Sequence, residues 1–315
     1  MGRKESQGLH PSQLTASSRE PDRRLSAGRL LGAAGIAPRK RLGQHFITDR
    51  NLLRKLAELM IPAPGFSAVE VGAGAGTLTL ELSKLALRVI AIEIDTRLRT
   101  VVDELLFPAT SNVSWIWGNV LEIDLEKLIS GAEGEEETSW VLCGNLPYYL
   151  TAELLYKVLI PRTNFSRLAF LVQKEVADRM AASPGGRDFG RLSLWCSYRG
   201  TVRILRRVPR QVFSPPPMVD SCLVTLDFHR SFPLNPSEEE SLDEISRHAF
   251  AQRRKTIANA LKGMFGNKKV LLDALDEAGI RPDSRPEQVL LEAYIRLARL
   301  RSTLRASSLP GQNMP

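Results

Sequence analysis

Apolar and polar positions follow two different periods along this chain. One period is helical, with apolar residues three and four positions apart, and the other consists of short apolar runs typical of buried strands. These periods predict helices at residues 50–60, 77–85 and 97–106 and strands at 68–71, 88–94 and 113–117. Strands and helices that alternate in this way form a parallel sheet wound with helices. We therefore predict an α/β fold for this part of the chain.

The alternation continues beyond an acidic insert at residues 131–137, which we predict to be a solvated surface loop. The later elements are strands at 140–144 and 168–173, a helix at 174–182 and β-rich segments at 192–198 and 222–228. Past a linker at 231–240 the pattern is helical and contains no strand candidate. The expected organisation is a disordered leader at 1–36, an α/β domain at 37–228, a helical domain at 229–302 and a disordered tail at 303–315.

Composition narrows the functional classes. The 315 residues carry a net charge of +8, which favours an acidic partner such as nucleic acid. Cys143, Cys196 and Cys222 have neither paired nor metal-like spacing, so we expect buried thiols in a reducing compartment. No apolar stretch approaches the ~20 residues that a membrane span needs. We expect a cytoplasmic monomer without a metal, and acidic residues in the leader make an organellar transit peptide the weaker alternative.

A glycine-rich turn follows the predicted strand at 68–71. In Gly72-x-Gly74-x-Gly76 the glycines accept positive φ and bring no side chain, so the backbone can turn tightly beneath a ligand. A dinucleotide site has its third glycine one position later, so this spacing disfavours a pyrophosphate ligand and an NAD-dependent dehydrogenase. Glu93 ends the next strand, where a carboxylate can bind both hydroxyls of a ribose. An exposed acid at a strand end is the plain alternative.

Two further segments border this turn. Asn119 follows the strand at 113–117, where its amide could accept from an adenine amino group and donate to a ring nitrogen, and a simple turn is an equally open interpretation. Upstream, the polar groups of residues 43–47 could close over the amino-acid end of the cofactor. From the residues alone, His45 is better explained as a local cap or a surface histidine. Together these positions predict a nucleoside cofactor.

The tetrad Asn145-Leu146-Pro147-Tyr148 follows the strand at 140–144, where open α/β sheets carry their chemistry. An aromatic amine is a poor nucleophile because its lone pair is delocalised, so position must replace basicity. If the Asn145 amide oxygen and the Leu146 carbonyl accept from the amine, they aim its lone pair at a methyl sulfonium. Proline rigidifies the turn, and the Tyr148 ring offers a stacking face for an extruded base. The tetrad therefore predicts methyl transfer to an amino nitrogen, with an ordinary strand-ending turn as the alternative.

Several segments in fixed order resemble those of the ribosomal RNA adenine N6,N6-dimethyltransferases. They are GQHF at 43–46, EVGAGAG at 70–76, NLPYY at 145–149, QKEVADR at 173–179, FGRLS at 189–193, VFSPPPMVDS at 212–221 and RRKT at 253–256. The resemblance extends from about Arg39 to Leu300. It implies a Rossmann-like, S-adenosylmethionine-dependent methyltransferase sheet followed by a small C-terminal helical domain.

The resemblance also assigns roles to individual residues. It implies cofactor contacts at Gln44, His45, Ile47, Gly72, Gly74, Glu93, Asn119 and Asn145, and a catalytic corner of Asn145, Leu146, Pro147, Tyr148 and Phe213. Phe213 would sandwich the target base opposite Tyr148, although core packing explains it better from the residues alone. Family members commonly have Asp where Asn119 stands and Pro where Ala73 stands. Asn119 keeps an acceptor oxygen, so we expect binding to survive with a weaker hydrogen bond.

Basic clusters at 39–41, 203–210 and 253–255 flank the segments that carry the chemistry. They would form a phosphate-binding surface if they share one face of the protein. We expect Arg253, Arg254 and Lys255 to lead RNA binding, because we place them on the first helix of the helical domain.

The implied reaction is dimethylation of the N6 amino groups of two adjacent adenosines in the 3′-terminal hairpin of small-subunit (16S) rRNA, with the assembling 30S particle as partner. One alternative is the related large-subunit rRNA adenine methylase of macrolide resistance, which typically has Ile in place of Leu146 and Asn in place of Asp220. Another is a non-catalytic ribosome-assembly factor or organellar transcription factor on the same fold. The intact tetrad and Glu93 argue against that second alternative.

Overall fold

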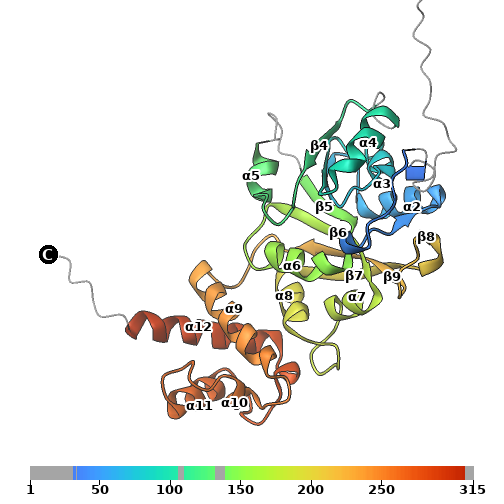
Figure 1. The fold of residues 1–315 in the computed structure, drawn as a ribbon. Coiled ribbons are helices and arrows are strands. Elements are labelled where there is room, and N and C mark those ends of the chain that lie inside the picture. Colours follow the sequence, from blue (N-terminus) through green and yellow to red (C-terminus); the bar gives the residue numbers. More distant parts are fainter. Residues whose placement is uncertain (1–30, 33, 106–109, 132–138, 309–315) are drawn as a thin grey trace, which may run out of the picture.

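The computed structural model describes residues 31–308, apart from 33, 106–109 and 132–138 (Figure 1). Most of the expected leader, residues 1–36, and most of the acidic insert at 131–137 lie outside the described residues. Within the leader, Leu31 is buried in one cluster with Phe46. Residues before 37 therefore already belong to the packed structure.

A seven-stranded sheet forms the centre of the molecule, with its strands in the order β4-β3-β2-β5-β6-β9-β7. The bounds are β2 Phe66–Val71, β3 Val89–Glu93, β4 Val113–Trp117, β5 Ser139–Asn145, β6 Phe165–Gln173, β7 Gly200–Val208 and β9 Ser221–Phe228. Strands β4 to β6 are parallel, and β9 and β7 add an antiparallel edge. The predicted α/β fold with a parallel sheet is confirmed.

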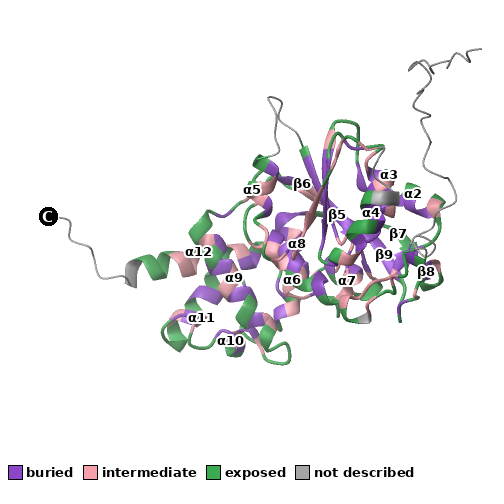
Figure 2. Cartoon of the chain, turned by 45° about the horizontal axis from the view of Figure 1, so that its top comes forward, coloured by how far each residue is buried: buried purple, intermediate pink, exposed green. Residues whose placement is uncertain are grey.

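Helices cover both faces of this sheet (Figures 1 and 2). Successive residues of a strand point to opposite faces, so neighbours in β5 enter different cores. Val141 packs in one cluster with α2 (Arg50–Met60) and α3 (Thr77–Leu82). Leu142 packs in the other cluster, with α6 (Tyr148–Leu159). The remaining α-helices of the described residues in this part are α4 (Arg99–Leu105), α5 (Leu125–Ser130), α7 (Lys174–Met180) and α8 (Arg191–Arg199).

A second, two-stranded sheet joins the segment at 43–47 to the chain before β9. Strand β1 (Phe46–Ile47) pairs antiparallel with β8 (Phe213–Ser214), and Ile47 lies opposite Phe213. This pairing brings two of the segments with predicted roles together.

The prediction of a β-rich segment at 192–198 is wrong. These residues belong to helix α8, Arg191–Arg199. The apolar alternation from Leu192 to Tyr198 imitates a strand, but the intervening Trp195 is fully buried as well, and its indole donates to Ser246 in the C-terminal part at 3.3 Å. The strand is the segment that follows, β7, whose arginines obscure its period.

The C-terminal part of the described chain is helical, as predicted. It consists of α9 (Pro236–Ala251), α10 (Ile257–Ala260), α11 (Lys268–Glu277) and α12 (Leu291–Ser308), with a short 3₁₀ turn at Pro286–Gln288. Helix α12 ends at Ser308, so residues 303–308 of the expected disordered tail are helical.

Two details of this part differ from the predictions. Helix α9 already begins at Pro236, because Asn235 and Glu238 form a capping box there, so the linker predicted at 231–240 ends early. The basic residues at 253–255 lie in the turn after α9 and not on the helix.

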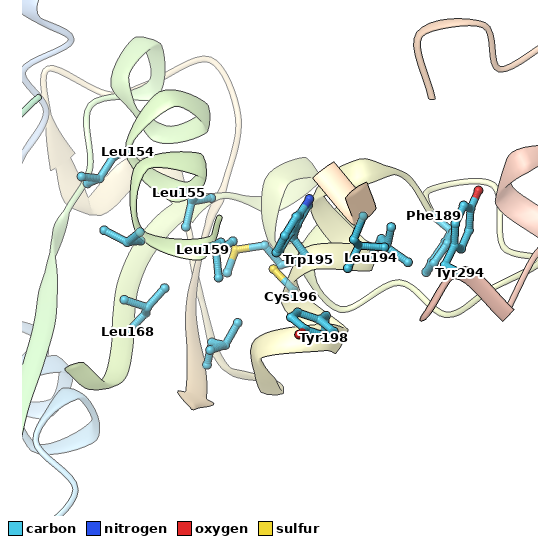
Figure 3. Close-up of a cluster of buried hydrophobic side chains, with 14 of the residues drawn as sticks. Leu154, Leu155, Leu159, Leu168, Phe189, Leu194, Trp195, Cys196, Tyr198 and Tyr294 are labelled. Atoms are coloured by element: carbon cyan, nitrogen blue, oxygen red, sulfur yellow. The ribbon is translucent and has the colours of Figure 1, made fainter. Parts of the chain in front are cut away.

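The helical part shares a continuous core with the sheet (Figure 3). Leu168 of β6 and Leu159 of α6 belong to the same cluster as Phe189, before α8, and Tyr294 of α12. No helix of the described residues is long and apolar enough to cross a membrane. Across the same residues, no group of three or more His, Cys, Asp or Glu side chains could hold a metal ion. The three cysteines are buried free thiols, as predicted.

Candidate active site

One cavity opens beside the carboxyl ends of β2, β3, β4 and β5. Its lining includes every residue predicted to bind cofactor or to form the catalytic corner: Gln44, His45, Ile47, Gly72, Gly74, Glu93, Asn119, Asn145, Leu146, Pro147, Tyr148 and Phe213. Parallel strands bring their carboxyl ends to one edge of a sheet, so motifs far apart in sequence meet there.

The glycine turn forms the floor of this cavity. Gly72, Gly74 and Gly76 all have positive φ, at 72°, 59° and 76°. At Gly74 a side chain would also collide with the chain, because its Cβ would lie 2.9 Å from Cε1 of Phe46. The backbone can therefore approach a ligand closely only with glycine here.

Glu93 is held in place by two backbone donors. The N–H of Gly74 donates to Oε2 at 2.8 Å, and the N–H of Asp95 donates to Oε1 at 2.8 Å. The side chain is buried, and burial raises the pKa of Glu93, while these hydrogen bonds oppose the rise. Each carboxylate oxygen keeps acceptor capacity, so the group can receive two hydroxyls.

Glu70 is a second buried acid in the same cavity, and sequence reasoning assigned no role to it. Burial raises the pKa of Glu70 to about 8, and the negative charge of Glu93 adds to the rise. The nearby Thr79 hydroxyl opposes the shift, yet neither it nor Oε2 of Glu70 has a hydrogen-bond partner among the described residues. The sequence feature that could have identified Glu70 is an acid inside an apolar strand, because an unpaired buried carboxyl is costly without a ligand.

Asn119 is engaged within its own turn. Its amide oxygen accepts from the N–H of Leu121 at 3.1 Å, and its amide nitrogen donates to Glu122 at 3.1 Å. The oxygen retains a second lone pair toward the cavity it lines.

Gln44 connects the entrance of the cavity to Asp95. It accepts from the N–H of Arg39 at 2.8 Å and donates to Asp95 at 3.1 Å. Burial raises the pKa of Asp95, but hydrogen bonds from Arg97 and Gln44 outweigh burial and leave this pKa below its usual value. Asp95 thus stays ionised and fixes the segment that precedes β1.

The amide of Asn145 has a defined orientation. Its Nδ2 donates to the backbone carbonyl of His45 at 2.9 Å. Among the described residues, no hydrogen bond reaches the Asn145 amide oxygen or the Leu146 carbonyl. These two acceptors are available to one amino group.

Gly144 brings the tetrad close to the glycine turn. Its φ is 147°, and a Cβ at this position would run into the backbone carbonyl of Val71 in β2. The two strands that carry the motifs are direct neighbours, with Glu70 opposite Cys143.

Aromatic groups border the catalytic corner. The rings of Tyr148 and His45 are 5.5 Å apart and tilted by 32°. The Tyr148 hydroxyl lies 3.3 Å from that of Ser221, and Nδ1 of His45 lies 2.7 Å from the Pro215 carbonyl. Phe213 is buried in the core and also lines the cavity, while its stacking on the target base stays a prediction.

Of the basic residues at 253–255, one makes contacts within the protein and the other two are exposed. The Arg253 guanidinium donates to the carbonyls of Arg187 at 2.8 Å and Phe189 at 2.9 Å, and so ties the turn after α9 to the loop before α8. Arg254 and Lys255 are exposed.

Solved structures with a similar fold are methyltransferases. A dimethyladenosine transferase from Plasmodium falciparum superposes with a TM-score of 0.66 at 24% identity, over 80% of this chain and 96% of that one. The 23S rRNA methyltransferase ErmE superposes with a TM-score of 0.60 at 22% identity, over 81% of this chain and 98% of that one. At these identities the likeness establishes the fold.

Relatives found by sequence share a higher identity with this chain than these two solved structures do. A protein named ribosomal RNA small subunit methyltransferase A from Moorella thermoacetica is 38% identical over 273 residues, covering 86% of this chain and 94% of the relative. A protein of the same name from a Geobacillus species is 36% identical, covering 85% and 93%. The family model for ribosomal RNA adenine dimethylases matches residues 36–300. The chain therefore belongs to the ribosomal RNA adenine dimethylase family.

Proposed function

We propose that this protein dimethylates the N6 amino groups of two adjacent adenosines in the 3′-terminal hairpin of small-subunit (16S) rRNA during ribosome assembly. Its methyl donor is S-adenosylmethionine. The observation that carries the proposal is the oriented Asn145 amide, whose free oxygen shares a cavity with the buried carboxylate of Glu93. Family membership and the names of the relatives support the substrate. We place the protein in the cytoplasm, acting as a monomer on the assembling 30S particle.

The residues of the cavity fit this donor. Glu93 would hold the ribose hydroxyls, and Asn119 would face the adenine. The glycine turn leaves room for the nucleoside because no side chain can occupy it. Glu93 supplies negative charge beside a cationic ligand, and Oε2 of Glu70 is a buried polar atom without a partner among the described residues, which a ligand could satisfy. When bound, the donor supplies an electrophilic methyl group on a sulfonium.

The catalytic corner orients the adenosine amine. The Asn145 amide oxygen and the Leu146 carbonyl accept hydrogen bonds from the N–H groups of the amine. These bonds draw the nitrogen toward a tetrahedral shape and free its lone pair. No strong base is required, because the amine loses its proton only after the new bond has made it acidic. Tyr148 and Phe213 present ring faces to the extruded base, and each such stacking contact is typically worth ~1–3 kcal/mol.

The test uses immature 30S particles from a strain that lacks adenine dimethylation. Purified protein and S-adenosylmethionine are added, and the rRNA is digested and analysed by mass spectrometry. We expect dimethyladenosine at the adjacent pair near the 3′ end, and none with the matched variant Asn145→Ala. Methylation elsewhere in the rRNA would overturn the proposed substrate, and intact donor binding without any methylation would favour an assembly factor.

A further inference from the structure

The antiparallel edge of the sheet carries an unusual run of exposed residues. Strand β7 pairs only with β9, so its other side is open among the described residues. Five consecutive residues, Arg203–Arg207, are all exposed (Figure 2). We call this stretch the basic edge. Side chains on both faces of the strand are therefore accessible there, although a strand of a covered sheet normally buries at least one face.

The arginines of the basic edge differ in their pairing. Arg203 forms an ion pair with Asp227 at 3.4 Å. Arg206 and Arg207 have no ion pair and no side-chain hydrogen bond with any described residue. The pairing register shifts between Ile204 and Arg206, as at a β-bulge, which re-aims side chains and turns an edge outward.

The basic edge leads to the catalytic corner. Val208 ends β7 and packs in one cluster with Phe213, which lines the cavity. Alternation places Arg206 on the face of Val208 and Arg207 on the opposite face. The two guanidinium groups thus flank the strand that runs toward the place where the target base would enter.

Two of the other basic residues are partly engaged within the protein. Arg253 donates from Nη2 to two backbone carbonyls. Arg210 donates to the carbonyl of Met218 at 3.3 Å. Arg41, Arg254 and Lys255 are exposed without an ion pair among the described residues, as are Arg206 and Arg207. What distinguishes Arg206 and Arg207 is that they are adjacent on one open strand whose end packs against Phe213 at the cavity.

We propose that the basic edge binds the phosphate backbone of the rRNA strand that delivers the target adenosine, with Arg206 and Arg207 as its principal contacts. This inference rests on the proposed function. Unpaired guanidinium groups complement phosphate charge and can bind it in a bidentate manner. The exposed aliphatic side chains that precede them, Ile204 at 39% and Leu205 at 38%, offer a surface to the sugars and bases of that strand.

The test compares Arg206→Gln/Arg207→Gln with a control of equal charge loss at the opposite sheet edge. The control is Arg99→Gln/Lys127→Gln, which removes exposed cations on α4 and α5. Binding to undimethylated immature 30S particles is measured by co-sedimentation at several KCl concentrations between about 50 and 200 mM, at fixed Mg²⁺. Thermal unfolding and donor titration check that each variant is folded.

Each phosphate contact to a single strand contributes about −0.7 to the slope of log affinity against log salt. We expect the β7 variant to lose about 1 to 1.5 in slope and at least about fivefold in affinity at low salt. The control should match the wild type, and Arg206→Lys/Arg207→Lys should recover most of the slope. Equal slopes for the β7 variant and the control would overturn the proposal. So would unchanged RNA binding with new self-association, because exposed edge charges also keep sheets apart.

A second measurement needs no variant. Phenylglyoxal labelling of wild-type arginines, read by mass spectrometry, is compared with and without the particles. We expect protection of Arg206 and Arg207 and continued labelling of Arg99, and labelling of both β7 arginines in the complex would reject the proposal. Methylation by the wild type in the same samples reports on the proposed function separately, because it can succeed while the basic edge stays unprotected.

Discussion

The side-chain amide of Asn145 donates to the backbone carbonyl of His45 at 2.9 Å. This bond uses the only donor group of the side chain and turns its oxygen toward the cavity. The bond also joins the tetrad to the segment that begins β1. One contact therefore orients the proposed catalytic acceptor and joins two segments that line the cavity.

Replacement of Asn145 by alanine should lower kcat by about 10²–10³ and leave donor affinity largely intact, because the lost acceptor acts on the target amine. Single-turnover methylation and calorimetric titration with S-adenosylmethionine measure the two effects. The isosteric Asn145→Asp keeps an acceptor but lacks the N–H for His45, so it should also be impaired. Normal turnover by Asn145→Ala would refute the mechanism.

Replacement of Glu93 by glutamine should weaken donor binding by about 10- to 100-fold, the range expected when charge-assisted hydrogen bonds are lost. The new amide would also direct an N–H toward the backbone donor of Gly74 or Asp95. Calorimetric titration measures the change. Glu58→Gln, at an exposed ion pair with Lys55, is the matched control. Wild-type affinity in Glu93→Gln would remove Glu93 from the donor site.

Glu70 should make the stability of the donor-free protein depend on pH. Its pKa is raised to about 8 in the folded state, above its ordinary value of 4.5, so folding favours the protonated carboxyl. The contribution is full below pH 4.5 and is lost as pH rises toward 8, with a total on the order of 3–5 kcal/mol. Urea unfolding at pH 5.5 and 8.5 should show a larger loss for the wild type than for Glu70→Gln. Equal losses would show that Glu70 titrates normally.

The buried Arg199 should be a main determinant of stability. Its guanidinium donates to the Leu159 carbonyl at 2.6 Å and to both oxygens of Glu239 at 3.0 and 3.1 Å, joining α6, α8 and α9. Breaking a buried pair typically costs about 3–5 kcal/mol, so Arg199→Leu should lower Tm by roughly 10 °C. The exposed pair of Arg99 and Asp103 serves as control, and Arg99→Gln should cost less than about 1 kcal/mol. A small shift for Arg199→Leu would contradict this role.

Deletion of residues 1–30 should leave donor affinity unchanged, whereas deletion of residues 1–36 should weaken it. The longer deletion removes Leu31, which is 3% exposed and packs in one cluster with Phe46. Phe46 in turn contacts the glycine turn at Gly74. Leu31→Ala in the full chain should reproduce part of the loss, at about 2 kcal/mol of stability. Equal affinities for the two truncations would show that Leu31 does not support the cavity.

Local sequence patterns predict which residues meet in one cavity better than they predict the elements around it. The glycine turn, Glu93 and the tetrad each directly follow or end a strand, and parallel strands place those ends together without further information. The segment at 192–198 is different, because alternating apolar residues fit a strand until the burial of Trp195 by a distant helix is known. At β7 the opposite happens, because its exposed arginines interrupt the apolar alternation and hide a strand.

Contacts between distant segments are the part that patterns miss. Arg253 belongs to a basic run that is typical of RNA binding, but its Nη2 donates to two carbonyls far away in sequence. The sequence contains no mark of that pairing. Glu70 lies between these two cases. The sequence shows an acid within an apolar strand, but only the three-dimensional packing shows that its Oε2 lacks a partner among the described residues.

Gly144 has a consequence for how this protein can vary. Because β5 passes Val71 without a side chain between them, the spacing of the two halves of the site depends on the pairing of adjacent strands. Loops that do not line the cavity can change length or sequence without altering the distance that a methyl group must travel. Adaptation to a different RNA context is thereby separated from the reaction itself, since the gap between donor and acceptor is set inside the sheet.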